Sequence, residues 1–417
     1  MRKILHSDLN NFYASVECLL DPSIRDFPVV VCGRVEDRHG IVLAKNMIAK
    51  KAGIKTGMVL YEAKNLCPSL KCVVAHHDLY LEYSRAVKDI YREYTDRVES
   101  FGIDEAWLDI TDCKLHGGDA LKIAQEIRQR VKTEIGLTVS IGVSFNKVFA
   151  KLGSDMKKPD AITVISPENY KELVWSLPVG DLLYVGRATK RKFEDLTIKT
   201  IGDLAKFDQK ILKTKFGKVG VMLSEYARGN DSDIVHTKQE LANIKSVGNS
   251  LTYYRDIKTE QDVFALLTLL CESVCVRMLC YGYKRAKTLS LTIMLDSLKH
   301  ITKTTKMQAT NLAEDMTKVA FDFFKKNFKW KDGIIRGLGV SLSNFSEEEQ
   351  LSIDTFFEDK DKKKTLQDAI ENLRNRYGRN IINRAVVFAD SHMQKLNIVG
   401  SHLGNIGRQV KKGTEEQ

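Results

Sequence analysis

Two adjacent carboxylates, Asp104 and Glu105, interrupt a stretch that is otherwise apolar and strand-like, SFGIDEAWLDIT at residues 100–111. A third carboxylate, Asp8, ends the first apolar strand pattern, ILHSDL. Three carboxylates that converge repel one another unless cations lie between them, and such hard oxygen ligands suit Mg²⁺. Two ions of this kind can hold the attacking and leaving oxygens of an in-line phosphoryl displacement. These residues therefore indicate a two-metal phosphoryl-transfer site, provided that the fold brings them together.

A simpler interpretation of the same pattern is a polar hairpin turn whose carboxylates lie in water. Adjacent residues of an extended strand point to opposite faces, so Asp104 and Glu105 can share a site only where the chain bends. The spacing alone leaves both interpretations open.

Two parts of the chain predict the same succession of elements. Residues 1–165 give strand, helix, strand, strand, helix, strand, with an insertion at about residues 20–75, which is a ferredoxin-like layout. Residues 243–345 give this order again without an evident sequence repeat, and residues 166–242 between them carry short helices and glycine turns. We therefore expect an α+β multidomain protein in which the first strand and the Asp104–Glu105 hairpin can lie side by side.

The net charge of +11 is unevenly distributed, since residues 243–345 hold 16 Lys and Arg against 9 Asp and Glu, a net +7. A basic domain on an otherwise balanced protein favours a polyanionic partner, although a solvated basic surface would give the same total. No stretch approaches the roughly 18 apolar residues that span a membrane, and Asp8 interrupts the region where a signal peptide would need its apolar run. We expect a cytoplasmic protein without a membrane segment.

Seven stretches together resemble the Y-family translesion DNA polymerases, bacterial DNA polymerase IV and its relatives, over roughly residues 1–345. They are DLNNFYASVE, AKNMIAKKAGIKTGM, IDEAWLDIT, SIGVSFNKVFAKLGSDMKKPD, KTIGDLA, KSVGNSLT and RGLGVSLSN. The resemblance implies a right-hand polymerase with a ferredoxin-like palm, small fingers, a helical thumb containing a helix-hairpin-helix, and a four-stranded α/β little finger. The implied ranges are 1–19 and 76–165 for the palm, 20–75 for the fingers, 166–233 for the thumb, 234–242 for a linker and 243–345 for the little finger. Residues 346–417 would be a charged linker, a short helix and a tail, which either fold alone or pack on the body.

The resemblance also assigns roles to residues of the site. Asp8, Asp104, Glu105 and the main-chain carbonyl of Leu9 would bind two Mg²⁺ ions, with Mn²⁺ as a substitute, and Asp104 and Glu105 would be catalytic. Phe12 and Tyr13 match the aromatic pair under the incoming sugar, with Tyr13 as the steric gate that leaves room for hydrogen but not hydroxyl at C2′. Lys50 and Lys158 match basic residues that meet the triphosphate, where a cation offsets the phosphate charge.

Further residues would contact DNA or a partner protein. Gly186 and Lys190 lie in DLLYVGRATKRKFEDL, which resembles a hairpin that presents N–H groups to DNA phosphates. Lys245, Ser246 and Arg336 would lie on little-finger strands along the duplex and give sequence-independent, salt-sensitive binding. Residues Gln350–Phe357 resemble the short peptide with which such polymerases engage the sliding clamp. The implied partners are primer–template DNA, a dNTP and the clamp, and the implied state is a monomer.

Several positions depart from the family pattern. Met47, Lys50, Gly102 and Tyr184 stand where many members carry Tyr, Arg, Ser and Gly. Lysine and arginine are not equivalent for bidentate phosphate binding, so unusual nucleotide affinity is expected, and Tyr184 predicts an irregular thumb turn. Asn10 stands where many members carry Asp, and we do not expect this to remove a metal ligand.

The sequence thus predicts a DNA-templated, low-fidelity DNA polymerase for translesion synthesis, which transfers a nucleotide from a dNTP to a primer 3′ hydroxyl. One alternative is a catalytically silent, polymerase-like DNA-binding subunit, which the departures favour and the intact carboxylates oppose. Another is a nucleotide cyclase, which can share the palm and the paired metals but does not explain the basic domain or the hairpin thumb.

Overall fold

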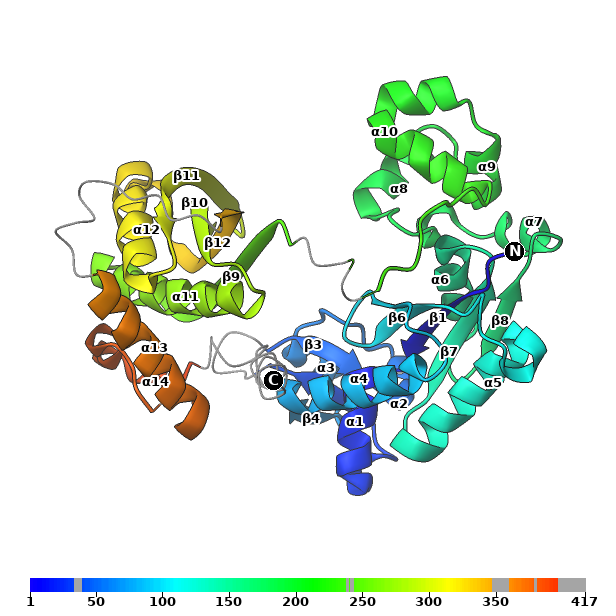
Figure 1. The fold of residues 1–417 in the computed structure, drawn as a ribbon, viewed down its shortest axis with the longest axis horizontal. Coiled ribbons are helices and arrows are strands. Elements are labelled where there is room, and N and C mark those ends of the chain that lie inside the picture. Colours follow the sequence, from blue (N-terminus) through cyan, green and yellow to red (C-terminus); the bar gives the residue numbers. More distant parts are fainter. Residues whose placement is uncertain (34–39, 238–239, 241–243, 347–359, 379–380, 397–417) are drawn as a thin grey trace, which may run out of the picture. The chain divides into compact units, whose positions relative to one another are not determined.

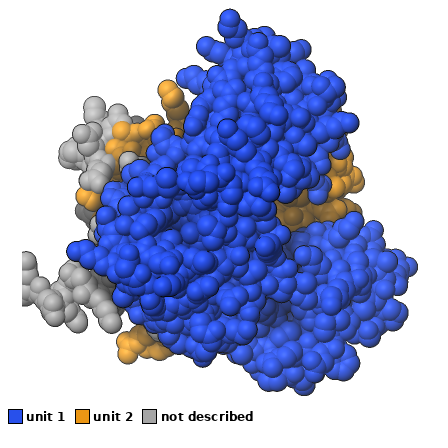
Figure 2. Space-filling model, turned by 90° about the vertical axis from the view of Figure 1, so that its right-hand side faces the viewer, with its two compact units in different colours: residues 1–33, 41–242 blue, residues 34–40, 243–417 orange. Residues whose placement is uncertain are grey.

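The computed structural model describes residues 1–33, 40–237, 240, 244–346, 360–378 and 381–396 (Figure 1). The chain divides into two compact units, residues 1–33 with 41–242 and residues 34–40 with 243–417 (Figure 2). Each unit has apolar cores of its own.

A five-stranded sheet with the order β5-β6-β1-β7-β8 forms the expected palm. Its strands are β1 (Ile4–Leu9), β5 (Val98–Ser100), β6 (Glu105–Asp109), β7 (Val139–Ser144) and β8 (Ile162–Ile165). Around it lie α1 (Phe12–Leu20), α4 (His77–Arg92), η3 (Leu115–Gly118), α5 (Ala120–Arg130), the π-helical turn η4 (Val131–Ile135) and α6 (Lys147–Met156). Strand alternation divides the sheet into two faces, as the period of two requires. Leu5, Leu9, Ala106 and Leu108 join the core with α1, α4 and α5, whereas Ile4 and Trp107 pack with Ala150 of α6.

Helix α6 lies unusually close to β7 because Gly142 has no side chain. A Cβ atom at Gly142 would lie 1.9 Å from the carbonyl oxygen of Ala150, which no side chain could tolerate. This close approach fixes the height of α6 above the face of the sheet that carries Asp8.

The expected fingers form a small sheet with the order β3-β2-β4, in which β2 pairs antiparallel with β3 and parallel with β4. The elements are η1 (Pro22–Ile24), β2 (Val29–Cys32), β3 (Val42–Lys45), α2 (Met47–Lys51), α3 (Leu60–Leu66) and β4 (Lys71–Val74). Helix α2 ends two residues before Gly53, which has a positive φ of 86°. Nine buried residues form a separate small core here, among them Val30, Val42 and Leu60.

The expected thumb is helical and packs on the far end of the palm. Its elements are α7 (Tyr170–Val174), η5 (Val179–Asp181), α8 (Arg187–Glu194), α9 (Ile201–Lys206) and α10 (Gln209–Ala227). The position predicted to be irregular, Tyr184, adopts a left-handed φ of 68°, the conformation that glycine takes most easily. After α10 the chain returns to the palm, where the buried Lys147 of α6 binds both Glu99 and Asp233, each at 2.8 Å.

The second unit contains a four-stranded antiparallel sheet with the order β11-β10-β12-β9 and two long helices on one face (Figure 1). The elements are β9 (Ser246–Ile257), α11 (Glu260–Cys280), β10 (Arg285–Leu295), β11 (His300–Thr310), α12 (Ala313–Asn327), η6 (Trp330–Asp332) and β12 (Ile335–Ser346). This is the strand–helix–strand–strand–helix–strand order that the sequence predicts.

The expectation that no stretch is apolar enough to cross a membrane is wrong for α11. Among the described residues, this one helix passes by length and composition, but 72% of its most apolar window is buried inside the protein. It is apolar all round because it lies in the core between the sheet, α12 and the C-terminal segment.

The C-terminal segment packs on the helical face of this unit. It contains α13 (Lys360–Tyr377), η8 (Ala385–Ala389) and α14 (Ser391–Lys395). The side chain of Gln367 on α13 accepts from the N–H of Ala313 at 3.0 Å and donates to the carbonyl of Asn311 at 2.9 Å. Val387 and Met393 are buried in the same core as α11. The described part of residues 366–417 therefore packs on the body.

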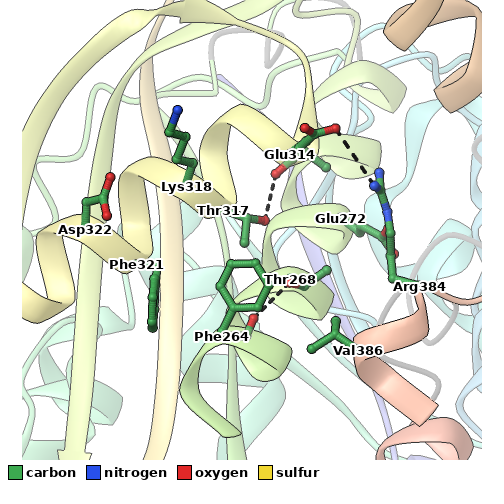
Figure 3. A pocket seen from close by; sticks show the side chains of 11 residues that line it. Phe264, Thr268, Glu272, Glu314, Thr317, Lys318, Phe321, Asp322, Arg384 and Val386 are labelled. Atoms are coloured by element: carbon green, nitrogen blue, oxygen red, sulfur yellow. Dashed lines mark hydrogen bonds and ion pairs between the residues drawn. The ribbon is translucent and has the colours of Figure 1, made fainter. Parts of the chain in front are cut away.

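A pocket of about 290 Å³ opens between α11, α12 and η8 (Figure 3). Phe264, Phe321 and Val386 line it, and Arg384 lies 4.0 Å from Glu314 at its rim. The predicted carboxylates belong to the first unit, so this pocket is not part of their site.

Candidate active site

Strand pairing brings the carboxylates of β1 and β6 together. Asp8 is the register partner of Glu105, and both lie on the sheet face that α6 covers. Asp104 precedes β6 in a bend of the chain, and its carbonyl accepts a hydrogen bond from the N–H of Leu9 at 3.0 Å. Because the chain bends at Asp104, this residue and Glu105 need not point to opposite faces as adjacent residues of an extended strand do.

Two lysines contact these carboxylates, Lys151 on α6 and Lys158 just after the end of this helix. Lys151 Nζ lies 2.5 Å from Glu105 Oε2 and 3.4 Å from Asp8 Oδ2. Lys158 Nζ lies 2.9 Å from Asp8 Oδ2 and 2.9 Å from Asp155 Oδ1. Sequence reasoning identified Lys158 but missed Lys151, which repeats at a spacing of four residues with Lys147 and Asp155 along α6.

The electrostatics follow from this crowding. Burial alone would raise the pKa of Glu105, but its contacts with His6 and Lys151 lower the pKa to about 2. Burial, followed by the charges of Asp8 and Glu105, raises the pKa of Asp104. Burial alone would lower the pKa of Lys151, but its carboxylate neighbours outweigh this and raise it. The ammonium groups of Lys151 and Lys158 therefore stay charged beside carboxylates that repel one another.

The carboxylates fit a divalent metal by chemistry, but their arrangement differs from the expected direct cluster. Within the described residues, no three His, Cys, Asp or Glu side chains are grouped closely enough to hold a metal ion as they stand. The ammonium groups of Lys151 and Lys158 contact the carboxylates instead, because like charges need a cation nearby. Carboxylate oxygens with a neighbouring main-chain carbonyl are the hard donors that Mg²⁺ prefers, and the lysines show that cations are accepted here.

The aromatic pair lies beside the carboxylates at the start of α1. Phe12 is buried, whereas Tyr13 is partly exposed, as the predicted division between core and site requires. Tyr13 stacks on Tyr80 of α4 with ring centroids 4.2 Å apart and contacts His77 edge-on at 5.8 Å. Burial and the charge of Asp104 raise the pKa of Tyr13, which places its hydroxyl in the field of the site. Tyr80 was missed; its signal is the aromatic residue in the first turns of α4.

The side chain of Asn10, which stands where many family members carry Asp, makes hydrogen bonds on the far side of β1 from the carboxylate contacts. Its Nδ2 donates to Ser140 Oγ at 2.9 Å, and its Oδ1 accepts from the N–H of Asp160 at 2.8 Å. The side chain thus turns away from the carboxylates and ties the loop that carries Lys158 to the end of β1.

Lys50 is exposed on α2, outside the carboxylate contacts. Its charge acts on Lys45, a half-buried lysine of β3 whose pKa is lowered by burial and then by Lys50. Lys45 donates to Thr56 Oγ1 at 3.1 Å. The fingers therefore carry a pair of neighbouring lysines, of which the sequence analysis identified one.

The expected DNA contacts fall on two separate surfaces. In the thumb, Gly186 is the N-cap of α8, and Lys190 lies on α8 at 3.9 Å from Glu194. In the second unit, Lys245 and Ser246 are exposed at the start of β9, and Arg336 lies at an irregularity in the pairing of β12.

The sheet face opposite α11 and α12 is mainly polar and uncharged, with Lys306 of β11 as a basic residue on it. Alternation and register place hydroxyls and glycines there. The set contains Ser246, Gly248, Ser250 and Thr252 of β9, Thr288, Ser290, Thr292 and Met294 of β10, His300, Thr302, Thr304 and Lys306 of β11, and Gly337, Gly339, Ser341 and Ser343 of β12. Ser290 and Thr304 hydrogen-bond across the strands at 2.8 Å. We call this set the open face.

Family models match three parts of the chain: the impB/mucB/samB family over residues 7–155, the DNA polymerase-iota thumb domain over residues 180–231, and the impB/mucB/samB family C-terminal domain over residues 244–355. DNA polymerase IV of Acetivibrio thermocellus is 45% identical over 95% of this chain and 100% of its own length. DNA polymerase IV of Pelotomaculum thermopropionicum is 35% identical over 92% of this chain and 94% of its own.

Solved structures give the same fold. A Y-family DNA polymerase chimera of Dbh and Dpo4 matches with a TM-score of 0.74, at 24% identity, over 82% of this chain and 99% of its own. An insertion ternary complex of Dbh DNA polymerase matches with a TM-score of 0.59 at the same identity and coverage.

Proposed function

The chain belongs to the Y-family DNA polymerases, in the DNA polymerase IV group of translesion enzymes, and we propose that Asp8, Asp104 and Glu105 form its metal-binding catalytic centre. It is therefore a DNA-directed DNA polymerase, neither a nucleotide cyclase nor a silent subunit. The observation that supports this placement is the register of Asp8 with Glu105 beneath two lysines of the α6 region.

DNA polymerases of this group use divalent metals. We propose that the carboxylates of Asp8, Asp104 and Glu105, with the Leu9 carbonyl, hold two Mg²⁺ ions, for which Mn²⁺ can substitute. When bound, these ions polarise the reacting phosphate and favour the alkoxide form of the primer 3′ hydroxyl. Burial is the main cause of the raised pKa of Asp104, and the charges of Asp8 and Glu105 add to it. Bound cations would relieve the repulsion between these carboxylates.

The lysines would serve the triphosphate. Lys158 follows α6 on the loop that Asn10 holds, and its ammonium can leave Asp8 for a phosphate oxygen when a metal neutralises that carboxylate. A fixed cation there offsets charge that develops on the leaving pyrophosphate. Lys50, on the fingers, would contact the phosphates from the other side as a point charge.

Tyr13 would select the sugar. Its ring is held against Tyr80 by stacking, so it cannot easily move aside for a 2′ hydroxyl. A rigid wall rejects an added atom more strongly than a movable side chain does. Deoxynucleotides are therefore preferred over ribonucleotides.

Primer–template DNA would contact the thumb and the open face by different chemistry. At Gly186 the first N–H groups of α8 are available to a phosphate, with Lys190 on the next turn. On the open face, hydroxyls and glycine backbone permit close approach of the duplex backbone, with Ser246 within the face and Lys245 and Arg336 beside it. Such contacts carry no sequence information, which suits an enzyme that copies many templates with low fidelity.

Residues Gln350–Phe357 lie outside the described residues. We infer a sliding-clamp peptide there from the sequence alone. A fluorescent peptide of residues 346–360 should bind a bacterial clamp, and replacement of Phe356 and Phe357 by Ala should abolish that binding.

Primer extension tests the active site. With Mg²⁺ and dNTPs, the wild type should extend a primer, and Asp104→Asn should lose at least about 100-fold in rate, since even indirect metal partners contribute 10–100-fold. Asp112→Asn, an exposed acid a few residues along the chain, is the matched control and should retain the wild-type rate. Equal activity of the Asp104→Asn variant and the wild type would overturn the assignment.

A further inference from the structure

The turn that carries Asp104 is held from outside by a lysine on α4. The turn links β5 to β6 at residues 101–104. Lys88 Nζ donates to the carbonyl of Gly102 at 2.8 Å and to that of Ile103 at 3.3 Å. Ser84 Oγ, one helical turn earlier, also donates to the Ile103 carbonyl. The next carbonyl, of Asp104, accepts from Leu9. Three successive carbonyls are therefore fixed by α4 on one side and β1 on the other.

The turn has little stiffness of its own. Gly102 gives it the backbone freedom of glycine, and a Cβ at this position would lie 3.2 Å from Asp104 Oδ1. The missing side chain thus leaves space that the Asp104 carboxylate uses, and it also removes a side chain that could brace the bend.

Lys88 is an unusual residue for a purely structural contact. It is half-buried, and burial lowers its pKa to about 8, although the charge of Asp104 opposes this. Desolvating an ammonium group is unfavourable unless acceptors surround it, and here the acceptors are the carbonyls of the turn. A compact ammonium with three donors can serve two neighbouring carbonyls at once.

We propose that Lys88 is a positioning residue for the polymerase reaction, whose ammonium group holds the Gly102–Ile103 carbonyls so that Asp104 bends into the site beside Asp8 and Glu105. The inference rests on the proposed role of Asp104 as a metal ligand. Among the described residues, the hydrogen bonds of Lys88 go to the turn, so its role is to hold the backbone and not to take part in the chemistry.

The test compares Lys88→Met, which keeps length but loses the donors, with Lys88→Arg, which keeps donors. Arg92→Met is the matched control, because Arg92 lies one turn further along α4 and pairs only with the exposed Asp89 among the described residues. Five quantities are measured: kcat, dNTP KM, the Mg²⁺ concentration for half-maximal rate, amide hydrogen exchange of Leu9 and Phe101 in metal-free protein, and the unfolding temperature.

Lys88→Met should lower kcat about 10–100-fold and raise the Mg²⁺ midpoint, as loss of an indirect metal partner does, with dNTP KM within about twofold. Its Leu9 and Phe101 amides should exchange faster, because their acceptors at Asp104 and Glu105 are less fixed. Lys88→Arg should stay within about threefold of wild type in kcat, dNTP KM, the Mg²⁺ midpoint and the two exchange rates, as should Arg92→Met.

Unchanged kcat and unchanged Leu9 exchange in Lys88→Met would overturn the proposal. So would a loss of activity with an unchanged Mg²⁺ midpoint that follows only a lowered unfolding temperature, because that pattern is merely structural. The proposed function fails separately, if Asp104→Asn remains active; faster Leu9 exchange in Lys88→Met would then still establish that Lys88 holds the turn.

Discussion

The palm and the second unit each bury carboxylates against basic side chains, and the two clusters differ in how completely their charges are matched. In the second unit, Glu272 accepts from Arg374 at 3.1 Å through one oxygen and from Arg384 at 3.0 Å through the other. Arg374 also binds Glu371 and the carbonyl of Ile382. Both carboxylate oxygens of Glu272 thus have a guanidinium partner, and the charge of this buried carboxylate is matched.

The palm cluster is open by comparison. Asp8 and Glu105 share Lys151, whereas Asp104 has no ion pair among the described residues. The negative charges of Asp8 and Glu105 repel the carboxylate of Asp104. A buried polar cluster that is fully satisfied stabilises one packing, whereas a partly satisfied one stores repulsion that a cation can relieve. The comparison suggests that residual repulsion, more than burial, distinguishes the functional cluster from the structural one.

The largest effect on stability is expected from a change in the cluster of Glu272, Arg374, Arg384 and Glu371, which we call the closed cluster. Arg374→Met should lower the free energy of unfolding of the second unit by about 3–5 kcal/mol, because it removes one partner from a buried charge. Urea unfolding followed by circular dichroism measures this. Arg376→Met, on the exposed side of α13, is the control, and an equal loss in both variants would contradict a closed cluster. A Glu272→Leu/Arg374→Met double variant should recover part of the loss.

In the palm, the side chain of Tyr13 should determine the preference for deoxynucleotides over ribonucleotides. Tyr13→Ala should reduce the preference for dCTP over CTP by about 10–200-fold, the range that a single steric feature of a pocket supplies. Ratios of kcat/KM from single-nucleotide insertion give the preference. Tyr80→Phe keeps the stacked ring and should keep the preference. If Tyr13→Ala discriminates as well as wild type, another residue is the gate.

Removal of one negative charge from the palm carboxylates should not destabilise the fold. Because the pKa of Asp104 is raised in the folded protein, its ionised form costs stability at neutral pH. Metal-free Asp104→Asn should therefore be as stable as wild type or more stable, by at most about 1 kcal/mol for a partly solvated group. Thermal unfolding in EDTA measures this, and a marked destabilisation would make Asp104 a structural residue like Glu272.

Most of the fold follows from local patterns that the sequence displays. Period-two and helical apolar spacing predict the strand and helix order of both sheets, because each element needs one buried face. The open face could have been read from the alternation in TLSLTIML, yet total charge suggested a basic sheet. Lys306 lies on this face and Lys245 and Arg336 lie beside it, so composition located the domain but did not predict that most of this surface is uncharged.

The candidate site was predicted less completely because it depends on register and on contacts between distant elements. Asp8 and Glu105 were identified, but Lys151 was not, since α6 alone is an ordinary amphipathic helix. The close packing of α6 against β7 depends on Gly142, whose missing side chain leaves room for the backbone of the helix. The helical pattern of α6 alone does not show this contact. Lys88 was likewise invisible, because a lysine on α4 has meaning only through the turn it meets.

The smallest effect expected is a pH dependence in the C-terminal segment. Burial alone would raise the pKa of Asp390, but hydrogen bonds lower it: Tyr253 Oη donates at 2.6 Å, the His392 N–H at 2.8 Å, and Arg255 and Tyr254 at 3.2 Å each. A lowered carboxyl pKa contributes stability that is present above its unfolded value, about 3.9, and lost as pH falls through the folded value. Wild type should therefore lose stability below about pH 4 more steeply than Asp390→Asn does, as measured by urea unfolding at several pH values. Asp368→Asn, on the exposed side of α13, should follow wild type. If Asp390→Asn falls as steeply as wild type, then this carboxylate does not fasten the segment, which is then held by the Glu272 cluster, the Gln367 hydrogen bonds and the buried Val387 and Met393.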